Sequence, residues 1–126
     1  MFALKVINNP YNVQGELHAD VLGELRALQA LSQSTSYHAH VVRIYDFWIE
    51  RGNSPRLFIK MELCESNLED FLSGLCHTNK EIDPLDLLEI MIQISSGLQF
   101  CHNNNVLHRD LKTSNGNYPV GLKHNK

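Results

Sequence analysis

The chain has 126 residues, of which 43% are hydrophobic and 20% are charged, and its formal net charge is −3 at pH 7. This length suits one small domain, and this composition excludes a disordered chain. The sequence has no block of lysine and arginine, so neither nucleic acid nor an anionic membrane is expected as a partner. The pattern of apolar residues predicts neither a secretory signal nor a transmembrane helix.

The cysteines and histidines do not follow any metal-binding pattern. The three cysteines are Cys64, Cys76 and Cys101. Their odd number and the absence of a C-x-x-C spacing argue against a disulfide framework or a zinc site, and favour a reduced cytoplasmic or nuclear protein. His38 and His40 are two residues apart, but the histidines other than His108 are interpreted as ordinary polar residues.

The first half of the chain predicts three strands and one helix. Residues 2–7 are apolar and partly β-branched, which predicts a strand. The Asn-Asn-Pro sequence of residues 8–10 is expected to terminate it. Apolar residues recur at helical spacing over residues 14–31. Residues 41–50 and 57–63 are rich in β-branched and aromatic side chains and flank a turn, so they predict an antiparallel hairpin.

Two helices are predicted after this hairpin. Residues 66–69 match a capping box, which predicts a short helix that ends near Gly74. Asp83 followed by Pro84 is a typical helix start, and this longer helix is expected to end near His102. Apolar residues occupy most of its circumference, so we expect it to be buried on several sides.

The chemically most informative segment is residues 108–115, which follow the pattern H-R-D-L-x-x-x-N. It places the carboxylate of Asp110, the ammonium group of Lys112 and the carboxamide of Asn115 in one short loop. Phosphoryl transfer needs a group that orients the attacking hydroxyl, cations that offset phosphate charge, and oxygen ligands for Mg²⁺. The loop suits this chemistry, and the pattern is that of the catalytic loop of protein kinases.

In this loop and in the landmarks before it, the chain resembles the protein kinase superfamily, and within it the serine/threonine branch. Residues 2–5 resemble the V-A-I-K strand, and residues 23–28 resemble the helix that supplies the glutamate partner of its lysine. Residues 60–64 resemble the gatekeeper and hinge, and residues 97–102 the end of the helix before the catalytic loop. The resemblance implies an α+β, partial protein-kinase-like fold: antiparallel small-lobe strands, their helix, a hinge and the start of the helical large lobe.

The resemblance also implies that ATP and Mg²⁺ are bound. Lys5 would contact the α- and β-phosphates, and Glu24 would hold Lys5 through an ion pair. Glu16 is the alternative partner, and Glu24 is preferred because it begins an E-x-x-x-L pattern with Leu28.

The adenine would lie between the strands and the hinge. Ala3 would form part of the surface above it, although a small core residue would occupy the same place. Met61 would be the gatekeeper, and methionine is otherwise an ordinary core filler. The resemblance further implies that backbone groups of Glu62 and Cys64 bind the adenine edge.

The catalytic loop would act on the hydroxyl of a serine or threonine in a protein substrate. By the resemblance, Asp110 would accept or orient the hydroxyl proton, and it is interpreted as a buried, paired carboxylate. Lys112 would neutralise the γ-phosphate, and Asn115 would bind Mg²⁺. His108 would pack in the hydrophobic spine of the family.

Residues 1–115 are therefore predicted to be a partial kinase domain, and residues 116–126 a divergent, disordered tail. The sequence has no G-x-G-x-x-G loop before Lys5 and neither a D-F-G motif nor an activation segment after Asn115, so we expect a domain truncated at both ends. Losing one preorganised charge-stabilising group costs about 10²–10³ in rate. Three readings stay open: a kinase fragment unable to catalyse alone, a catalytically dead module that binds nucleotide or a kinase partner, and a product without a stable fold.

Overall fold

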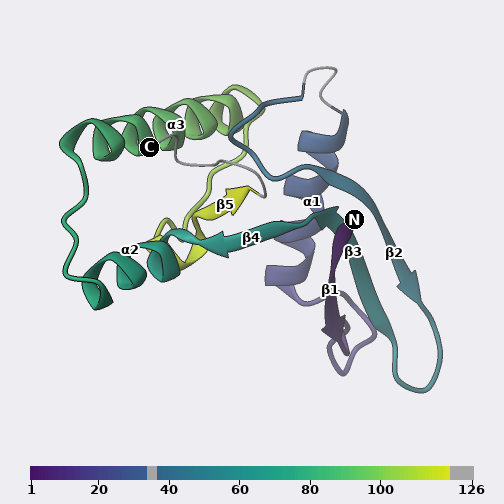
Figure 1. The fold of residues 1–126 in the computed structure, drawn as a ribbon. Helices are drawn as coiled ribbons and strands as arrows, with labels where there is room; N and C mark the ends of the chain where they lie inside the picture. Colours follow the sequence, from purple (N-terminus) through teal and green to yellow (C-terminus); the bar gives the residue numbers. More distant parts are fainter. Residues whose placement is uncertain (34–36, 120–126) are drawn as a thin grey trace.

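The computed structural model describes residues 1–33 and 37–119. Its elements, in chain order, are β1 (Phe2–Asn8), α1 (Ala19–Gln33), β2 (Ile44–Glu50), β3 (Arg56–Glu62), β4 (Cys64–Asn67), α2 (Leu68–His77), α3 (Pro84–Asn103), the 3-10 turn η1 (Thr113–Asn115) and β5 (Asn117–Pro119). The sheet of β1, β2 and β3 lies with α1 at one end of the molecule, α2 and α3 lie at the other, and β4 and β5 run between them (Figure 1). The predicted α+β class is confirmed.

The core lies between α1 and one face of the three-stranded sheet. The strand order is β1-β3-β2 with antiparallel pairing throughout, which makes β3 the central strand. Leu57 and Ile59 of β3 are 0% exposed, and Val21 and Leu28 of α1 pack with them. Val21 and Leu28 are two helical turns apart and therefore share one face, which explains the helical spacing seen in the sequence.

The helix α1 begins at Ala19, later than the start predicted at residue 14. The side-chain oxygen of Asn12 accepts hydrogen bonds from the backbone N–H groups of Gln14 at 2.9 Å and Glu16 at 3.0 Å. Gly15 has a φ of +79°, which glycine adopts without steric cost. These local bonds give the backbone an alternative to the helix, and helical spacing alone does not reveal them.

The predicted hairpin is confirmed as β2 and β3, with a later start for β2. The sequence predicted a strand from residue 41, whereas β2 begins at Ile44. The backbone N–H of Val41 instead donates to the carbonyl of His38 at 3.2 Å, which closes a turn before the strand. Val41 and Val42, which lie before β2, are also β-branched, so composition alone placed the start of the strand three residues too early.

Both predicted helices that follow are present. The cap of α2 is Asn67, whose side chain accepts from the backbone N–H of Asp70 at 2.8 Å, so the predicted capping box is wrong by one residue. Ser66 is instead part of β4. Asp83 caps α3 as predicted, since its carboxylate accepts from the backbone N–H of Leu85 at 2.7 Å.

The last described residues, Asn117–Pro119, form β5, which pairs antiparallel with β4. The prediction of an unstructured tail is therefore wrong for these three residues, and residues 120–126 lie outside the described part. Pairing with β5 satisfies backbone N–H and C=O groups of β4. Residues with any side chain can form such backbone hydrogen bonds, so residue type does not predict them. Three residues are too few to show a periodic pattern. The domain boundary at Asn115 stays a prediction.

The helix α3 is buried over its second half only. Gly97 and Cys101 are its buried residues. Five apolar side chains of its first half are exposed: Leu85, Leu87, Leu88, Met91 and Ile92. The expected burial on several sides is therefore not found among the described residues. None of the helices in residues 1–33 and 37–119 is both long and apolar enough to cross a membrane.

Candidate functional site

The first group of predicted site residues lies where β1 meets α1. The ammonium group of Lys5 on β1 forms an ion pair with the carboxylate of Glu24 on α1. Their side chains are 48% and 33% exposed, so the pair adds only about 0–1 kcal/mol to stability. Its importance is positional, because it fixes the lysine at the junction of strand and helix. The alternative partner, Glu16, lies in the turn before α1.

Ala3 and Met61 lie on the same face of the sheet as Lys5. Ala3 is directly opposite Met61 in the pairing of β1 with β3, and Lys5 is opposite Ile59. Because side chains two residues apart in a strand share a face, these positions all lie on the face that α1 covers. Met61 is half-buried and packs against the core. The roles of these residues in nucleotide binding stay predictions.

The hinge residues make contacts within the protein. The backbone N–H of Glu62 donates to the carbonyl of Arg43 at 2.8 Å, and its carboxylate accepts from the N–H of Arg43 at 3.2 Å. The backbone N–H of Glu62 is therefore not free to bind an adenine edge. Cys64 pairs with Pro119 of β5. Burial and then the charge of Glu62 raise the pKa of the Cys64 thiol, which keeps it protonated and poorly nucleophilic at neutral pH.

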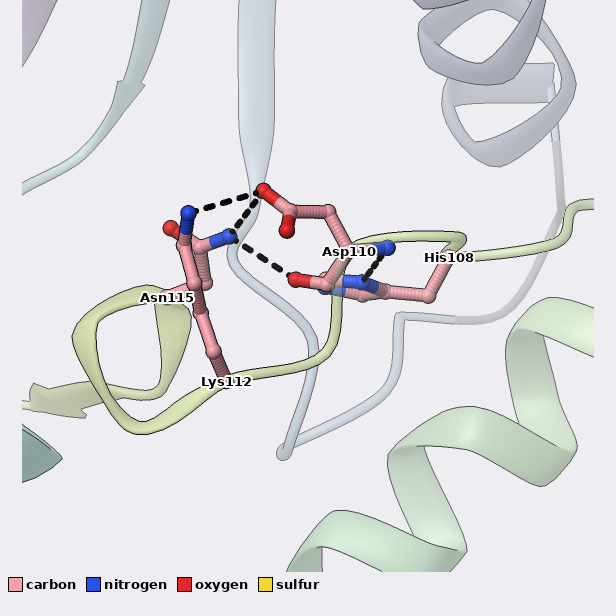
Figure 2. A network of polar contacts seen from close by, with 4 residues as sticks. All are labelled: His108, Asp110, Lys112 and Asn115. Atoms are coloured by element: carbon pink, nitrogen blue, oxygen red, sulfur yellow. Dashed lines mark hydrogen bonds and ion pairs between the residues drawn. The ribbon is translucent and has the colours of Figure 1, made fainter.

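The three predicted residues of the catalytic loop come together in one network (Figure 2). One carboxylate oxygen of Asp110 lies 3.2 Å from the ammonium group of Lys112. The same oxygen accepts a hydrogen bond of 2.9 Å from the side-chain amide of Asn115, which also donates to the backbone carbonyl of Asp110 at 2.9 Å. Figure 2 shows the amide oxygen of Asn115 turned away from Asp110.

The donor role of Asn115 toward Asp110 was missed in the sequence, where Asn115 was expected only as a Mg²⁺ ligand. A carboxamide carries both a donor and an acceptor, so it can orient a carboxylate and still offer its oxygen to a cation. The chemistry of the residue was therefore a usable signal. Its spacing from Asp110 was not, because a loop has no fixed period.

Asp110 is an exposed carboxylate, not a buried one, with 67% of its side chain accessible. Its pKa is lowered by the hydrogen bond from Lys112, then by the hydrogen bond from Asn115 and the charge of Lys112. Desolvation opposes this shift only weakly. Asp110 is consequently an ionised acceptor at neutral pH, as a residue that takes up a hydroxyl proton must be.

The backbone at Arg109 turns sharply and directs Asp110. Arg109 has a φ of +60°, and the N–H of Asp110 donates to the carbonyl of His108 at 2.9 Å, two residues back. This strained γ-turn conformation is uncommon outside glycine. His108 is exposed, and its Nδ1 atom lies 3.4 Å from the N–H of Asp110. The prediction that His108 packs in a hydrophobic spine is wrong, because its ring remains at the loop surface.

Replacing Lys112 with methionine should raise the pKa of Asp110 toward the ordinary aspartate value, because the largest cause of the lowering is removed. Asn115→Ala should raise it less. Because the pKa of Asp110 is lowered, its contacts with Lys112 and Asn115 stabilise the loop fully at a pH above the ordinary pKa of aspartate. This stabilisation is lost as the pH falls through the lowered pKa of Asp110. The carboxyl ¹³C shift of Asp110 measures this, with Lys80→Met as the charge-matched control. Equal titration of Asp110 in the Lys112→Met and Lys80→Met chains would contradict the assignment.

The oxygen donors of the loop suit Mg²⁺ that arrives with a nucleotide. Over residues 1–33 and 37–119, no group of three or more His, Cys, Asp or Glu side chains could hold a metal ion. Asn115 offers an amide oxygen, a hard ligand, which is turned away from Asp110. Mg²⁺ in proteins is commonly held by one or two oxygen ligands of the protein together with substrate phosphates and waters. The residues present therefore fit Mg²⁺ shared with ATP.

The structure has a lysine–glutamate pair between a strand and its packed helix, and an Asp–Lys–Asn loop after a long helix. These features are typical of the class of proteins with a kinase-type site. Comparison with known families agrees with this class. The family described as "Protein kinase domain" matches residues 1–116. The chain belongs to the protein kinase family.

The curated relatives that the chain resembles include proteins named as kinases. Cell division control protein 2 homolog D of Antirrhinum majus is 32% identical over 98 residues, which are 75% of this chain and 30% of that protein. CDPK-related kinase 4 of Arabidopsis thaliana is 33% identical over 113 residues, 90% of this chain and 18% of that protein. Serine/threonine-protein kinase atg1 of Dictyostelium discoideum is 32% identical over 116 residues, 90% of this chain and 16% of that protein. The chain thus spans less than a third of each of these relatives.

Proposed function

We propose that this chain is the nucleotide-binding and catalytic-loop part of a serine/threonine protein kinase, which transfers phosphate from ATP to serine or threonine hydroxyls of a protein. The observation that carries the proposal is the network in which Lys112 and Asn115 bind one oxygen of an ionised Asp110. A lysine two residues after the catalytic aspartate resembles the serine/threonine branch. The similarity to a relative named as a serine/threonine-protein kinase supports the same branch.

Each residue would have a defined task. The second oxygen of the Asp110 carboxylate would orient the substrate hydroxyl and take its proton. Lys112 would offset the charge on the transferred phosphate. Lys5, held by Glu24, would position the α- and β-phosphates. When bound, Mg-ATP supplies the phosphoryl group and further charge neutralisation, and Asn115 would contribute its amide oxygen to the cation.

The chain by itself is proposed to bind nucleotide while transferring little or no phosphate. The second candidate is a catalytically dead module that binds nucleotide or a complete kinase. The Lys5–Glu24 ion pair favours nucleotide binding in both cases, because the pair is formed without a ligand. The free cysteines support a further proposal, that the protein works in a reducing cytoplasmic or nuclear environment.

We expect Mg-ATP to raise the thermal unfolding temperature of the chain, because a ligand that binds only the folded state stabilises it by mass action. Lys5→Met should remove most of this increase, whereas Lys80→Met, a lysine outside both site groups, should leave it unchanged. Differential scanning fluorimetry over a series of Mg-ATP concentrations measures the effect. An equal increase in the Lys5→Met and Lys80→Met chains would refute the nucleotide site at Lys5.

Phosphate transfer provides the test of activity. On incubation with radiolabelled ATP and a generic serine/threonine peptide, the unmodified chain should transfer no more phosphate than a chain that carries Asp110→Asn. Transfer by the unmodified chain that is lost on Asp110→Asn would show that these residues catalyse without any further part. Transfer that survives Asp110→Asn would remove Asp110 from the catalytic role.

A further inference from the structure

The catalytic loop is joined to the start of α2 by a backbone hydrogen bond. The N–H of Leu68, the first residue of α2, donates to the carbonyl of Gly116 at 2.6 Å. Gly116 directly follows Asn115, whose side-chain amide donates to the carboxylate of Asp110 at 2.9 Å. Two segments far apart in the sequence therefore meet one residue away from the network of the catalytic loop.

The backbones of these two segments stay in contact on both sides of this bond. Asn117 of β5 is opposite Asn67 of β4, so the pairing of the two strands leads directly into the bond between Leu68 and Gly116 (Figure 1). A Cβ atom at Gly116 would lie 3.4 Å from the Cβ atom of Leu68, which is van der Waals contact. The turn η1 packs against both β4 and α2. The end of the catalytic loop is therefore seated on the start of α2.

Other backbone bonds of this turn are local. The N–H of Asn115 donates to the carbonyl of Lys112 at 3.0 Å, and the N–H of Gly116 donates to the carbonyl of Thr113 at 3.3 Å. Such bonds fix the shape of η1 but not its position relative to the rest of the molecule. Burial does not fix this position either, because the side chains of the network are exposed. The bond from Leu68 ties the turn to a helix of 10 residues.

We propose that Leu68 is a positioning residue for the catalytic loop: its backbone N–H holds Gly116, and through it Asn115, beside Asp110. The first N–H groups of a helix have no partner within the helix, so this donor is available to bind another segment. The start of α2 thereby sets where the amide of Asn115 lies relative to the carboxylate of Asp110. This role rests on the proposed function, in which Asn115 supports Asp110 and contributes an oxygen to Mg²⁺.

Leu68→Pro should remove this donor and keep the helix. Proline is favoured at the first helical position, and α3 of the same chain begins with Pro84 after its cap, Asp83. Asn67, which caps α2, has a φ of −102° and a ψ of 168°, the extended conformation that residues before proline adopt. The proline ring takes the place of the proton that Gly116 accepts, so the bond is lost and the carbonyl is displaced.

NMR of the side-chain amide of Asn115 measures the result. In Leu68→Pro its protons should exchange with water about twofold to tenfold faster, the factor that one lost hydrogen bond supports. Leu68→Ala is the matched control, because it also removes the leucine side chain but keeps the N–H, and it should leave the exchange unchanged. The side-chain amide of Asn104, which donates to the carbonyl of Phe100 at 2.8 Å, should be unchanged in both variants. Equal exchange of the Asn115 amide in Leu68→Pro and Leu68→Ala would overturn the proposal.

The unmodified chain provides a second measurement if Leu68→Pro does not fold. Exchange of the Leu68 amide and of the Asn115 side-chain amide should accelerate together as urea is added below the unfolding transition, because both depend on one local contact. Release of the Asn115 amide while the Leu68 amide stays protected would exclude Leu68 as the positioning residue. Neither measurement uses ATP or phosphate transfer, so a failure of this bond and a failure of the kinase proposal can be told apart.

Discussion

Ile59→Ala should lower the free energy of unfolding by about 2–5 kcal/mol, the usual cost of truncating a large buried side chain. Ile59 is 0% exposed and lies on the central strand, between Lys5 of β1 and Phe47 of β2. The cavity would open directly beside the ion-paired lysine. We therefore expect the substitution to weaken Mg-ATP binding as well. Urea unfolding followed by circular dichroism measures the stability change.

The matched control is Leu4→Ala on the neighbouring strand. Leu4 is 44% exposed and lies on the opposite face of the sheet from Lys5, so its loss should cost less than about 1 kcal/mol, the usual range for positions away from the core. Equal losses for Ile59→Ala and Leu4→Ala would show that the core is not where the structure places it.

The core and the catalytic loop could be predicted from the sequence because short-range sequence patterns indicate both. Alternation along β3 identifies the buried face that Leu57 and Ile59 occupy. The order of Asp110, Lys112 and Asn115 fixes which groups share the loop, and the structure brings these three side chains into contact.

The failed predictions concern backbone geometry and exposure, which side-chain patterns describe poorly. The late start of α1 depends on the side chain of Asn12 and on a positive φ at Gly15. The strand β5 depends on backbone pairing with β4. The exposure of His108 and Asp110 follows from a loop that stays on the surface. In the first two cases a bond that involves the backbone outweighed the expectation from residue type.

Gly97→Ala should destabilise the chain by about 1–3 kcal/mol, although alanine is the better helix former. A Cβ atom at Gly97 would lie 2.6 Å from the carbonyl oxygen of His40 and 3.4 Å from its carbonyl carbon. The obstacle is backbone and cannot rotate away as a side chain could. Either α3 or the segment around His40 must therefore shift, and the contacts of His38 with Ser96 and Phe100 of α3 would be strained in the same movement.

Gly23→Ala in α1 isolates this steric effect from helix propensity. No atom would lie within 4 Å of the added Cβ, so the substitution should stabilise the chain by about 0.5–1 kcal/mol through propensity alone. Two glycine-to-alanine changes in helices should thus have opposite signs in thermal unfolding. If Gly97→Ala were also stabilising, α3 would not approach His40 as closely as the structure shows.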